Sequence, residues 1–397
     1  MNSANQRRAQ TGWRALALWL RIRFFSLDQP LFWLMMAIFV LSLFAVYSAS
    51  HDDPDRFINH LRNLAMSLTL MCVLSQIPSV QLQRAAIPLY ITSLLLLVAV
   101  QFFGETSKGA TRWLNIGITR IQPSEIMKIA MPMMLAWFIH RKEGLEGWRN
   151  WLAACLMLVV PTLFILKQPD LGTAVLVAAS GTFVLYFAGI SWRLLLWVSL
   201  AVLMLVILLI TLGDAACAPD ISWPGLREYQ RQRICTLLNP MQDPLGKGFH
   251  ILQSMIAVGS GGLVGKGWLQ GTQTQLEFIP ERATDFIFAG YAEEFGFIGA
   301  TLVVILYLGV VLRGLWIAIG APTIFSRLLS GSLSLMIFTY AFVNLGMVTG
   351  ILPVVGVPLP FISYGGTAMV TLGIGLGLIF SIARDRSRVT QGFSLQR

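Results

Sequence analysis

The stretch Gly271–Gly296 reads GTQTQLEFIPERATDFIFAGYAEEFG, carries five acidic side chains and runs directly into apolar sequence typical of membrane segments. Ionisable groups beside a bilayer segment are energetically costly, so their default interpretation is a functional site. Asp285 lies where the polar part meets the apolar part. It is the first candidate for a catalytic residue. The alternative is a carboxylate in the first turn of a helix, where the helix dipole stabilises negative charge.

The rest of the chain is unusually apolar. Of its 397 residues, 56% are hydrophobic and 12% are charged, whereas a soluble globular protein has about 25% charged residues. Apolar runs of about 17–25 residues recur and match the thickness of a bilayer. The sequence therefore predicts an all-α fold, that of a polytopic membrane protein. The runs are continuous rather than alternating, which argues against a membrane β-barrel.

About ten membrane spans are predicted. They cover 31–48, 62–78, 86–103, 124–140, 151–166, 172–188, 194–212, 297–318, 328–350 and 365–384. Lys and Arg accumulate on the cytoplasmic side of membrane proteins, and this bias assigns both termini to the cytoplasm. The predicted parts are a basic cytoplasmic segment (1–29), one membrane-embedded domain (30–384) with a large extracytoplasmic loop (213–285), and a cytoplasmic tail (385–397).

Several cations lie on the predicted outer side, against that bias. They are Lys108, Arg112, Arg120, Lys167, Arg231, Arg233, Lys247 and Lys266. A single such residue is readily explained as a surface charge that reaches lipid headgroups. So many together indicate an anionic ligand, such as a phosphate. The net charge of +10 is not attributed to nucleic acid, because no recognition motif for nucleic acid is present.

A first polar cluster, GATRWLNIGITRIQPSEIMK (109–128), ends at the start of a predicted span. Glu125 and Lys128 are three residues apart, so they share one helix face and can pair. The pair either neutralises itself in the bilayer or belongs to a site. Arg112 and Arg120 arrive beside it and leave a net positive patch.

A second polar cluster is KQPDLGTA (167–174), in which Pro169 breaks one helix. Asp170 then falls at or near the start of the next helix, where the helix dipole favours a carboxylate. Capping that helix is one interpretation. An active-site ion pair with the nearby Lys167 is the other.

The long loop contains a third cluster. EYQRQRICTLLNP (228–240) brings Arg231 and Arg233, and GKGFHILQSMIAVGSGG (246–262) has the pattern of a short amphipathic helix along the membrane. Thr284 is expected to cap a helix that begins near Asp285.

The loop also holds two of the four cysteines, Cys217 and Cys235. A disulfide is chemically permitted outside the cytoplasm. Two cysteines alone are a weak signal, and we weigh the unpaired state above the bond.

A fourth cluster, Gly346–Met369, has three prolines and several glycines and cannot form one smooth helix. Irregular backbone at membrane depth is tolerated where protein buries it or where it lines a cavity. No charge lies between Arg327 and Arg384, so this cluster is expected to shape a cavity wall and to do little chemistry.

Four sequence blocks carry a family resemblance that covers nearly the whole chain. They are GATRWLNIG…RIQPSEIMK, KQPDLGTA, YQRQRI…DPLGKGFHILQSMIAVGSGGLVGKGWLQGTQTQLEFIPERATDF…AEEFG and LPVVGVPLPFISYGG. Together they resemble the SEDS family (shape, elongation, division and sporulation). The GTQTQLEFIPE wording is similar to the branch that acts in elongation rather than division. One departure is Ala283, where the family commonly has histidine.

The resemblance implies a peptidoglycan glycosyltransferase of the bacterial cytoplasmic membrane that polymerises lipid II during cell elongation. The family's essential aspartate carries over to Asp285, and its polar positions carry over to Glu125, Lys128 and Asp170, with Arg120 before them. The expected catalytic residues are therefore Asp285, Lys128, Glu125 and Asp170. The expected substrate-binding residues are Arg112, Arg120, Lys167, Arg231, Arg233 and Glu281.

In the expected mechanism Asp285 accepts a proton from a sugar hydroxyl, and the cations stabilise the departing pyrophosphate. A divalent cation, Mg²⁺ or Mn²⁺, is the one candidate cofactor, held at Asp170 or Asp285. The expected partners are a class B penicillin-binding protein, lipid II with the nascent glycan strand, membrane proteins of the elongation machinery and membrane lipids.

Two other function classes stay open. A lipid II flippase would also use many spans and broken helices, but it should keep polar groups near mid-membrane, and here they gather on the outer side. A non-catalytic scaffold for the crosslinking enzyme would leave the outer cations unexplained.

Overall fold

Long helices overlap every predicted span in the computed structural model, which describes residues 27–107, 110–115, 117, 120–211, 217, 228–239, 247–276 and 281–394. These helices are α2 (Gln29–Ala49), α3 (Pro54–Leu74), α4 (Ser79–Phe103), α5 (Pro123–Arg141), α6 (Trp148–Lys167), α7 (Leu171–Phe187), α8 (Trp192–Thr211), α13 (Ile287–Ile319), α14 (Ile324–Val348) and α15 (Gly366–Ser394). Among the residues that the structure describes, seven of these helices are long and apolar enough to cross a membrane: α2, α3, α4, α6, α13, α14 and α15. The multi-pass helical membrane fold is thereby confirmed, and the number of ten spans stays a prediction.

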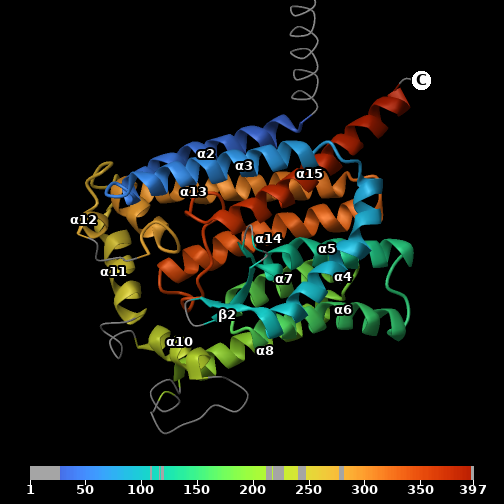
Figure 1. The fold of residues 1–397 in the computed structure, drawn as a ribbon, viewed down its shortest axis with the longest axis horizontal. Coiled ribbons are helices and arrows are strands. Elements are labelled where there is room, and N and C mark those ends of the chain that lie inside the picture. Colours follow the sequence, from blue (N-terminus) through green and yellow to red (C-terminus); the bar gives the residue numbers. More distant parts are fainter. Residues whose placement is uncertain are drawn as a thin grey trace, which may run out of the picture.

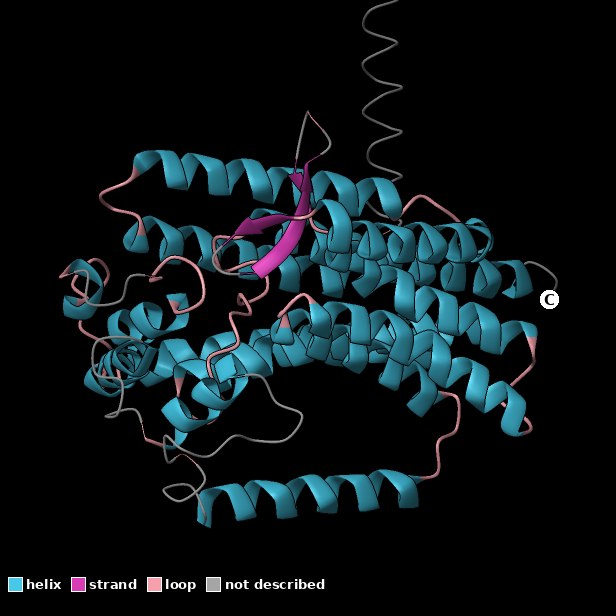
Figure 2. Ribbon diagram, turned by 60° about the horizontal axis from the view of Figure 1, so that its bottom comes forward, coloured by secondary structure: helices cyan, strands magenta, loops and turns pink. Residues whose placement is uncertain are grey.

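The helices lie side by side, and the chain reverses direction from one to the next (Figure 1). The large loop folds at one end of this bundle as α10 (Glu228–Leu238), α11 (Lys247–Ser260) and α12 (Thr272–Gln275). We call this the loop end. The C-terminal part of α15 reaches the opposite end (Figure 1). In Figure 2, α8 runs apart from the other long helices.

Helix α3 begins at Pro54, well before the predicted start at residue 62. Asp53 caps the helix, because its side chain accepts a hydrogen bond from the amide of Arg56 at 3.2 Å, and proline suits the first helical position. Because the first turns are polar, the apolar run that predicts the span begins later than the helix itself. One of their residues, His60, is fully buried and lies 2.7 Å from the hydroxyl of Ser42.

Helix α13 also begins before its predicted span of 297–318 and is kinked. Gly296 has φ 64° and ψ −163° inside the helix. The amides beyond the kink, of Phe297 and Ile298, donate to the carbonyl oxygens of Gly262 and Leu263 at 2.9 and 3.1 Å. A Cβ atom on Gly296 would collide with the backbone nitrogen of Gly265, so this close approach requires glycine.

The predicted cap of α13 is wrong. The residue before its first turn is Phe286, and among the described residues no side chain caps this end. Thr284 instead donates its hydroxyl to the Glu281 carboxylate at 2.8 Å. Asp285 therefore precedes the helix and is not part of its first turn.

The fold is not purely helical. Between α4 and α5 the described chain forms a three-stranded antiparallel sheet of β1 (Glu105–Ser107), β2 (Ala110–Asn115) and β3 (Arg120–Ile121), magenta in Figure 2. Arg112 lies in β2 and Arg120 in β3, so the sheet carries both arginines at the loop end.

Two predictions about the large loop have opposite outcomes. The short helix expected within 246–262 is confirmed as α11, which packs against α13 and α14. The unpaired state of the loop cysteines is wrong, because Cys217 and Cys235 form a disulfide with a Cα–Cα distance of 5.6 Å. The 18-residue separation of the two cysteines does not by itself indicate that their side chains meet.

Candidate active site

A cavity of about 330 Å³ lies at the loop end. Its charged lining residues are Arg112 of β2, Glu125 and Lys128 of α5, Asp170 before α7, and Glu281 and Asp285 before α13. These are six of the ten predicted site residues, and they come from four separate parts of the chain. The remaining wall includes Gly356, Val357 and Pro358 from the proline-rich stretch, as the sequence predicts for that cluster.

Glu125 and Lys128 form the predicted pair on α5. The Lys128 ammonium donates to Glu125 Oε1 at 2.6 Å and to the Tyr340 hydroxyl at 2.5 Å. Lys128 is 2% exposed and Glu125 is 8% exposed. The pair therefore neutralises itself inside the bundle and also lines the cavity, and its catalytic role stays a prediction.

Asp170 caps α7 and also faces the cavity. Its side chain accepts a hydrogen bond from the amide of Thr173 at 3.2 Å and another from the side-chain amide of Gln122, also at 3.2 Å. The Nε atom of Arg112 lies 3.7 Å from Asp170 Oδ2, and Nη2 of Arg112 donates to the carbonyl oxygen of Pro169 at 3.3 Å. These contacts fix an arginine at the cavity wall.

The segment that carries Asp285 is held from two sides. The side-chain amide of Asn344 donates to the carbonyl oxygen of Asp285 at 2.8 Å. Two residues before Asp285, the carbonyl oxygen of Ala283 accepts a hydrogen bond from the Tyr364 amide at 2.8 Å. On the other side, Arg282 pairs with Asp52 at 3.0 Å. The half-buried Asp285 thus sits on backbone that neighbouring elements position.

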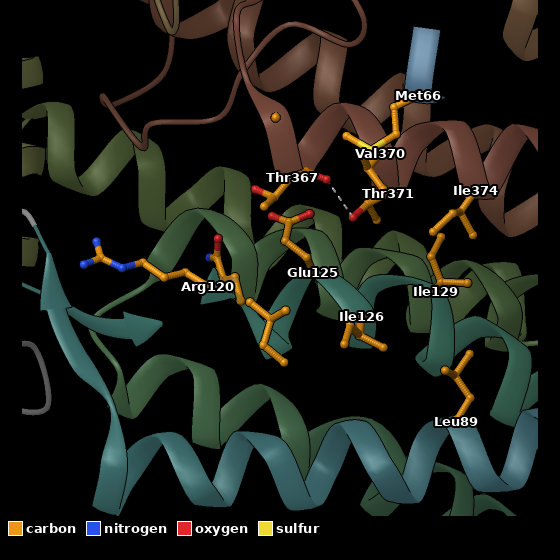
Figure 3. A pocket seen from close by; sticks show the side chains of 13 residues that line it. Met66, Leu89, Arg120, Glu125, Ile126, Ile129, Thr367, Val370, Thr371 and Ile374 are labelled. Carbon is orange, nitrogen blue, oxygen red and sulfur yellow. Dashed lines mark hydrogen bonds between the residues drawn. The ribbon is translucent and has the colours of Figure 1, made fainter. Parts of the chain in front are cut away.

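Four predicted site residues lie outside the lining of this cavity. Arg120 pairs with Glu105 at 3.2 Å and points away from Glu125 (Figure 3). Lys167 is exposed in the last turn of α6. Arg231 and Arg233 belong to α10, and Arg233 donates to the carbonyl oxygen of Val355 at 3.4 Å, next to the cavity wall. Their predicted role in substrate binding stays a prediction.

Reasoning from the sequence missed the uncharged polar residues of the site. Tyr340, Asn344 and Gln122 each hydrogen-bond to one of the predicted catalytic residues. All ten site residues predicted from the sequence are charged, so these uncharged residues are not among them. A weak signal was present, because Tyr340 and Asn344 are polar residues four apart in an apolar span and so share a helix face.

A second pocket, of about 500 Å³, adjoins the cavity and is mostly apolar. Figure 3 shows its side chains: Met66 of α3, Leu89 of α4, Ile126 and Ile129 of α5, and Val370 and Ile374 of α15. Gln122, Glu125 and Thr367 line both pockets. We call the second pocket the apolar groove. Its polar end is therefore continuous with the charged cavity.

The donor set does not form a ready metal centre. Within the described residues no group of three or more His, Cys, Asp or Glu side chains could hold a metal ion. The oxygens of Asp170 already accept hydrogen bonds from Thr173 and Gln122. We therefore derive no chemical step through a bound metal.

Comparisons with known proteins agree with this architecture. Residues 28–388 match the family model FTSW_RODA_SPOVE, described as cell cycle protein. The peptidoglycan glycosyltransferase MrdB of Escherichia coli is 48% identical over 365 residues, which is 92% of this chain and 95% of that protein. The stage V sporulation protein E of Bacillus subtilis is 38% identical over 73% of this chain and 76% of that protein.

Two solved structures are also similar. One belongs to a peptidoglycan synthase complex that coordinates polymerization and crosslinking, with a TM-score of 0.75 and 30% identity, covering 91% of this chain and 98% of that one. The other is the rod shape determining protein RodA of Thermus thermophilus, with a TM-score of 0.66 and 26% identity, covering 91% and 97%. The chain belongs to the FtsW/RodA/SpoVE family of cell cycle proteins, the SEDS family that its motifs resemble.

Proposed function

We propose that this chain is a peptidoglycan glycosyltransferase that polymerises lipid II into β-1,4-linked glycan strands during cell elongation. The observation that carries the proposal is the cavity in which a half-buried carboxylate, Asp285, shares a wall with Arg112 and Lys128. A carboxylate and fixed cations are the two groups that glycosyl transfer from a pyrophosphate needs. The name of the 48% identical relative supports the same activity.

In this mechanism Asp285 is the general base. It accepts the proton of the GlcNAc 4-hydroxyl, whose oxygen attacks C1 of the donor sugar. The α-linked pyrophosphate leaves, and the new bond is β-1,4. A positioned general base typically accelerates such a step by about 10²–10⁴-fold.

Lys128 and Arg112 stabilise the leaving group. An ammonium has three donors, and Lys128 gives two of them to Glu125 and Tyr340, so one donor remains for a phosphate oxygen. Arg112 is oriented by Asp170 and by the carbonyl oxygen of Pro169. Fixed cations of this kind stabilise developing charge at little cost in reorganisation.

The apolar groove suits the polyprenyl tail of the substrate. It shares Gln122, Glu125 and Thr367 with the charged cavity. A pyrophosphate in the cavity therefore has an apolar path beside it, between α3, α4, α5 and α15. The exposed Arg120 stands at the polar end of this groove, where it can meet an anionic headgroup.

The setting follows from the same proposal. The protein would be an inner-membrane protein with cytoplasmic termini and an outward-facing site, because the lysine and arginine bias of its sequence favours that orientation. A class B penicillin-binding protein is the proposed partner, supported by the similar synthase complex that couples polymerization to crosslinking. Elongation-machinery membrane proteins and membrane lipids complete the proposed surroundings. A divalent cation at Asp170 or Asp285 stays a prediction, to be tested by chelation and return of Mg²⁺ or Mn²⁺.

A flippase is the weaker candidate. Transport needs polar groups that are reachable from both ends of the bundle, whereas the charged cavity residues named above belong to the loop end. A scaffold without activity gives no reason for a carboxylate among fixed cations.

The decisive experiment is lipid II polymerisation by purified protein, with its partner present and the partner's crosslinking site blocked. Wild type should form glycan, and Asp285→Ala should form none while binding the partner normally. Asp55→Ala is a matched control, because Asp55 is an exposed carboxylate at the same end of the bundle. Normal polymerisation by Asp285→Ala would remove the proposed base.

A further inference from the structure

Two fully buried polar residues of α14 reach across to the two halves of the charged cavity. Tyr340 and Asn344 are both 0% exposed. They are four residues apart, so they lie on one face of the helix, about 6 Å apart along its axis. Each contacts a different group of the proposed reaction, Lys128 in one case and the Asp285 backbone in the other.

Asn344 joins two segments that are far apart in the sequence. Its side-chain nitrogen donates to the carbonyl oxygen of Asp285 at 2.8 Å and to that of Val357 at 2.7 Å. An amide group is planar, so two donations from one nitrogen restrict where both carbonyls lie. Val357 and Asp285 both line the cavity. Asn344 thereby fixes the backbone of the base relative to the neighbouring backbone of Val357.

Tyr340 positions the Lys128 ammonium in a similar way. Its hydroxyl accepts a hydrogen bond from the Lys128 ammonium at 2.5 Å. Lysine has a long, flexible side chain, and Glu125 alone, on the same helix, contacts it through one oxygen at 2.6 Å. The contact with Tyr340 adds a second direction from another helix. Lys128 is therefore placed by α5 and α14 together.

We propose that Tyr340 and Asn344 are positioning residues, and that α14 sets the distance between the base Asp285 and the cation Lys128. The inference rests on the proposed function, which assigns those two roles. A helix is a stiff element, and a shift of reacting groups by about 1 Å can cost roughly 10²-fold in rate. Tyr340 and Asn344, two uncharged residues of α14, thus act on the chemistry without contacting the substrate.

The test uses Tyr340→Phe and Asn344→Leu in full-length protein with the partner present and its crosslinking site blocked. We measure kcat and KM for lipid II, each normalised to the amount of folded protein. Each variant should lower kcat by about 10–100-fold and leave KM close to the wild-type value. Thr339→Val is the matched control, because the Thr339 hydroxyl donates within α14, to the carbonyl oxygen of Leu335 at 2.9 Å. It should keep the wild-type kcat.

A double-mutant cycle separates positioning from general damage. If Asn344 acts through Asp285, the losses of Asn344→Leu and Asp285→Glu do not multiply when they are combined, because a displaced base has already lost its geometry. Losses that multiply in full would overturn the proposal. So would wild-type kcat in both single variants, a change confined to KM, or a loss that disappears on normalisation to folded protein.

The outcome also distinguishes this inference from the proposed function. Full polymerisation by Asp285→Ala would remove the function, and the positioning role with it. Inactive Asp285→Ala together with fully active Tyr340→Phe and Asn344→Leu would remove the positioning role alone.

Discussion

Gly356 faces the carboxylate of Asp285: a Cβ atom on Gly356 would lie 3.3 Å from Oδ2 of Asp285. Gly356 has φ +76°, a conformation that favours glycine. The absence of a side chain at this position therefore leaves room beside the proposed base and permits the turn of the chain that lines it.

Gly356→Ala should lower polymerisation by roughly tenfold or more, because the added methyl group meets the Asp285 carboxylate and displaces it by a fraction of the ~1 Å that matters for catalysis. The assay is glycan formation from lipid II. Gly189→Ala is the control: Gly189 has φ +108° and open space around its Cβ position. It carries similar backbone strain without the contact. Equal activity of the two variants would contradict the prediction.

Asp170→Asn should separate the two roles of Asp170. Asparagine caps helices about as well as aspartate, whereas alanine costs about 0.5–2 kcal/mol. The amide loses the negative charge that orients Arg112. Asp170→Asn should therefore keep the wild-type melting temperature and lose polymerisation. Asp170→Ala should have a lower melting temperature and should also lose polymerisation. The measurements are thermal unfolding in detergent and glycan formation. An active Asp170→Asn would reduce this residue to a helix cap.

Glu293→Gln should loosen the return of the large loop onto α13. The fully buried Glu293 accepts hydrogen bonds from Lys266 at 2.6 Å and from the Thr272 hydroxyl at 2.8 Å. A hydrogen bond to a charged group contributes about 1.5–3 kcal/mol, so the neutral amide should lower the melting temperature and increase proteolysis within 261–276. Glu146→Gln, at an exposed position, is the control. Unchanged proteolysis would show that Glu293 does not hold this loop.

The disulfide should be visible by mass. Peptide mapping without reduction should recover Cys217 and Cys235 as one linked pair, and only reduction should let both react with an alkylating reagent. Cys72 and Cys155 are free and should be alkylated after unfolding without reduction. The bond also fits an oxidising compartment outside the cytoplasm. Alkylation of all four cysteines without reduction would contradict the structure.

Local features of the fold could be predicted because they depend on neighbours in the sequence. Apolar runs mark the long helices, and α11 was expected from its amphipathic pattern. Three-residue spacing alone puts Glu125 and Lys128 on one helix face, and they pair at 2.6 Å. The predicted start of a helix is too late where its first turns are polar, as at Pro54, because those turns do not belong to the apolar run.

The site itself depends on contacts between distant parts of the chain. The sequence by itself determined a multi-pass helical membrane protein and named six of the cavity's charged residues, because charge in an apolar chain is conspicuous. Only the tertiary structure decided which of them share a wall, and it left Arg120 and Lys167 outside. It alone joined Asn344 to Asp285 and Cys217 to Cys235. Helix spacing fixes what lies three or four residues away, whereas packing between helices fixes what lies across the cavity.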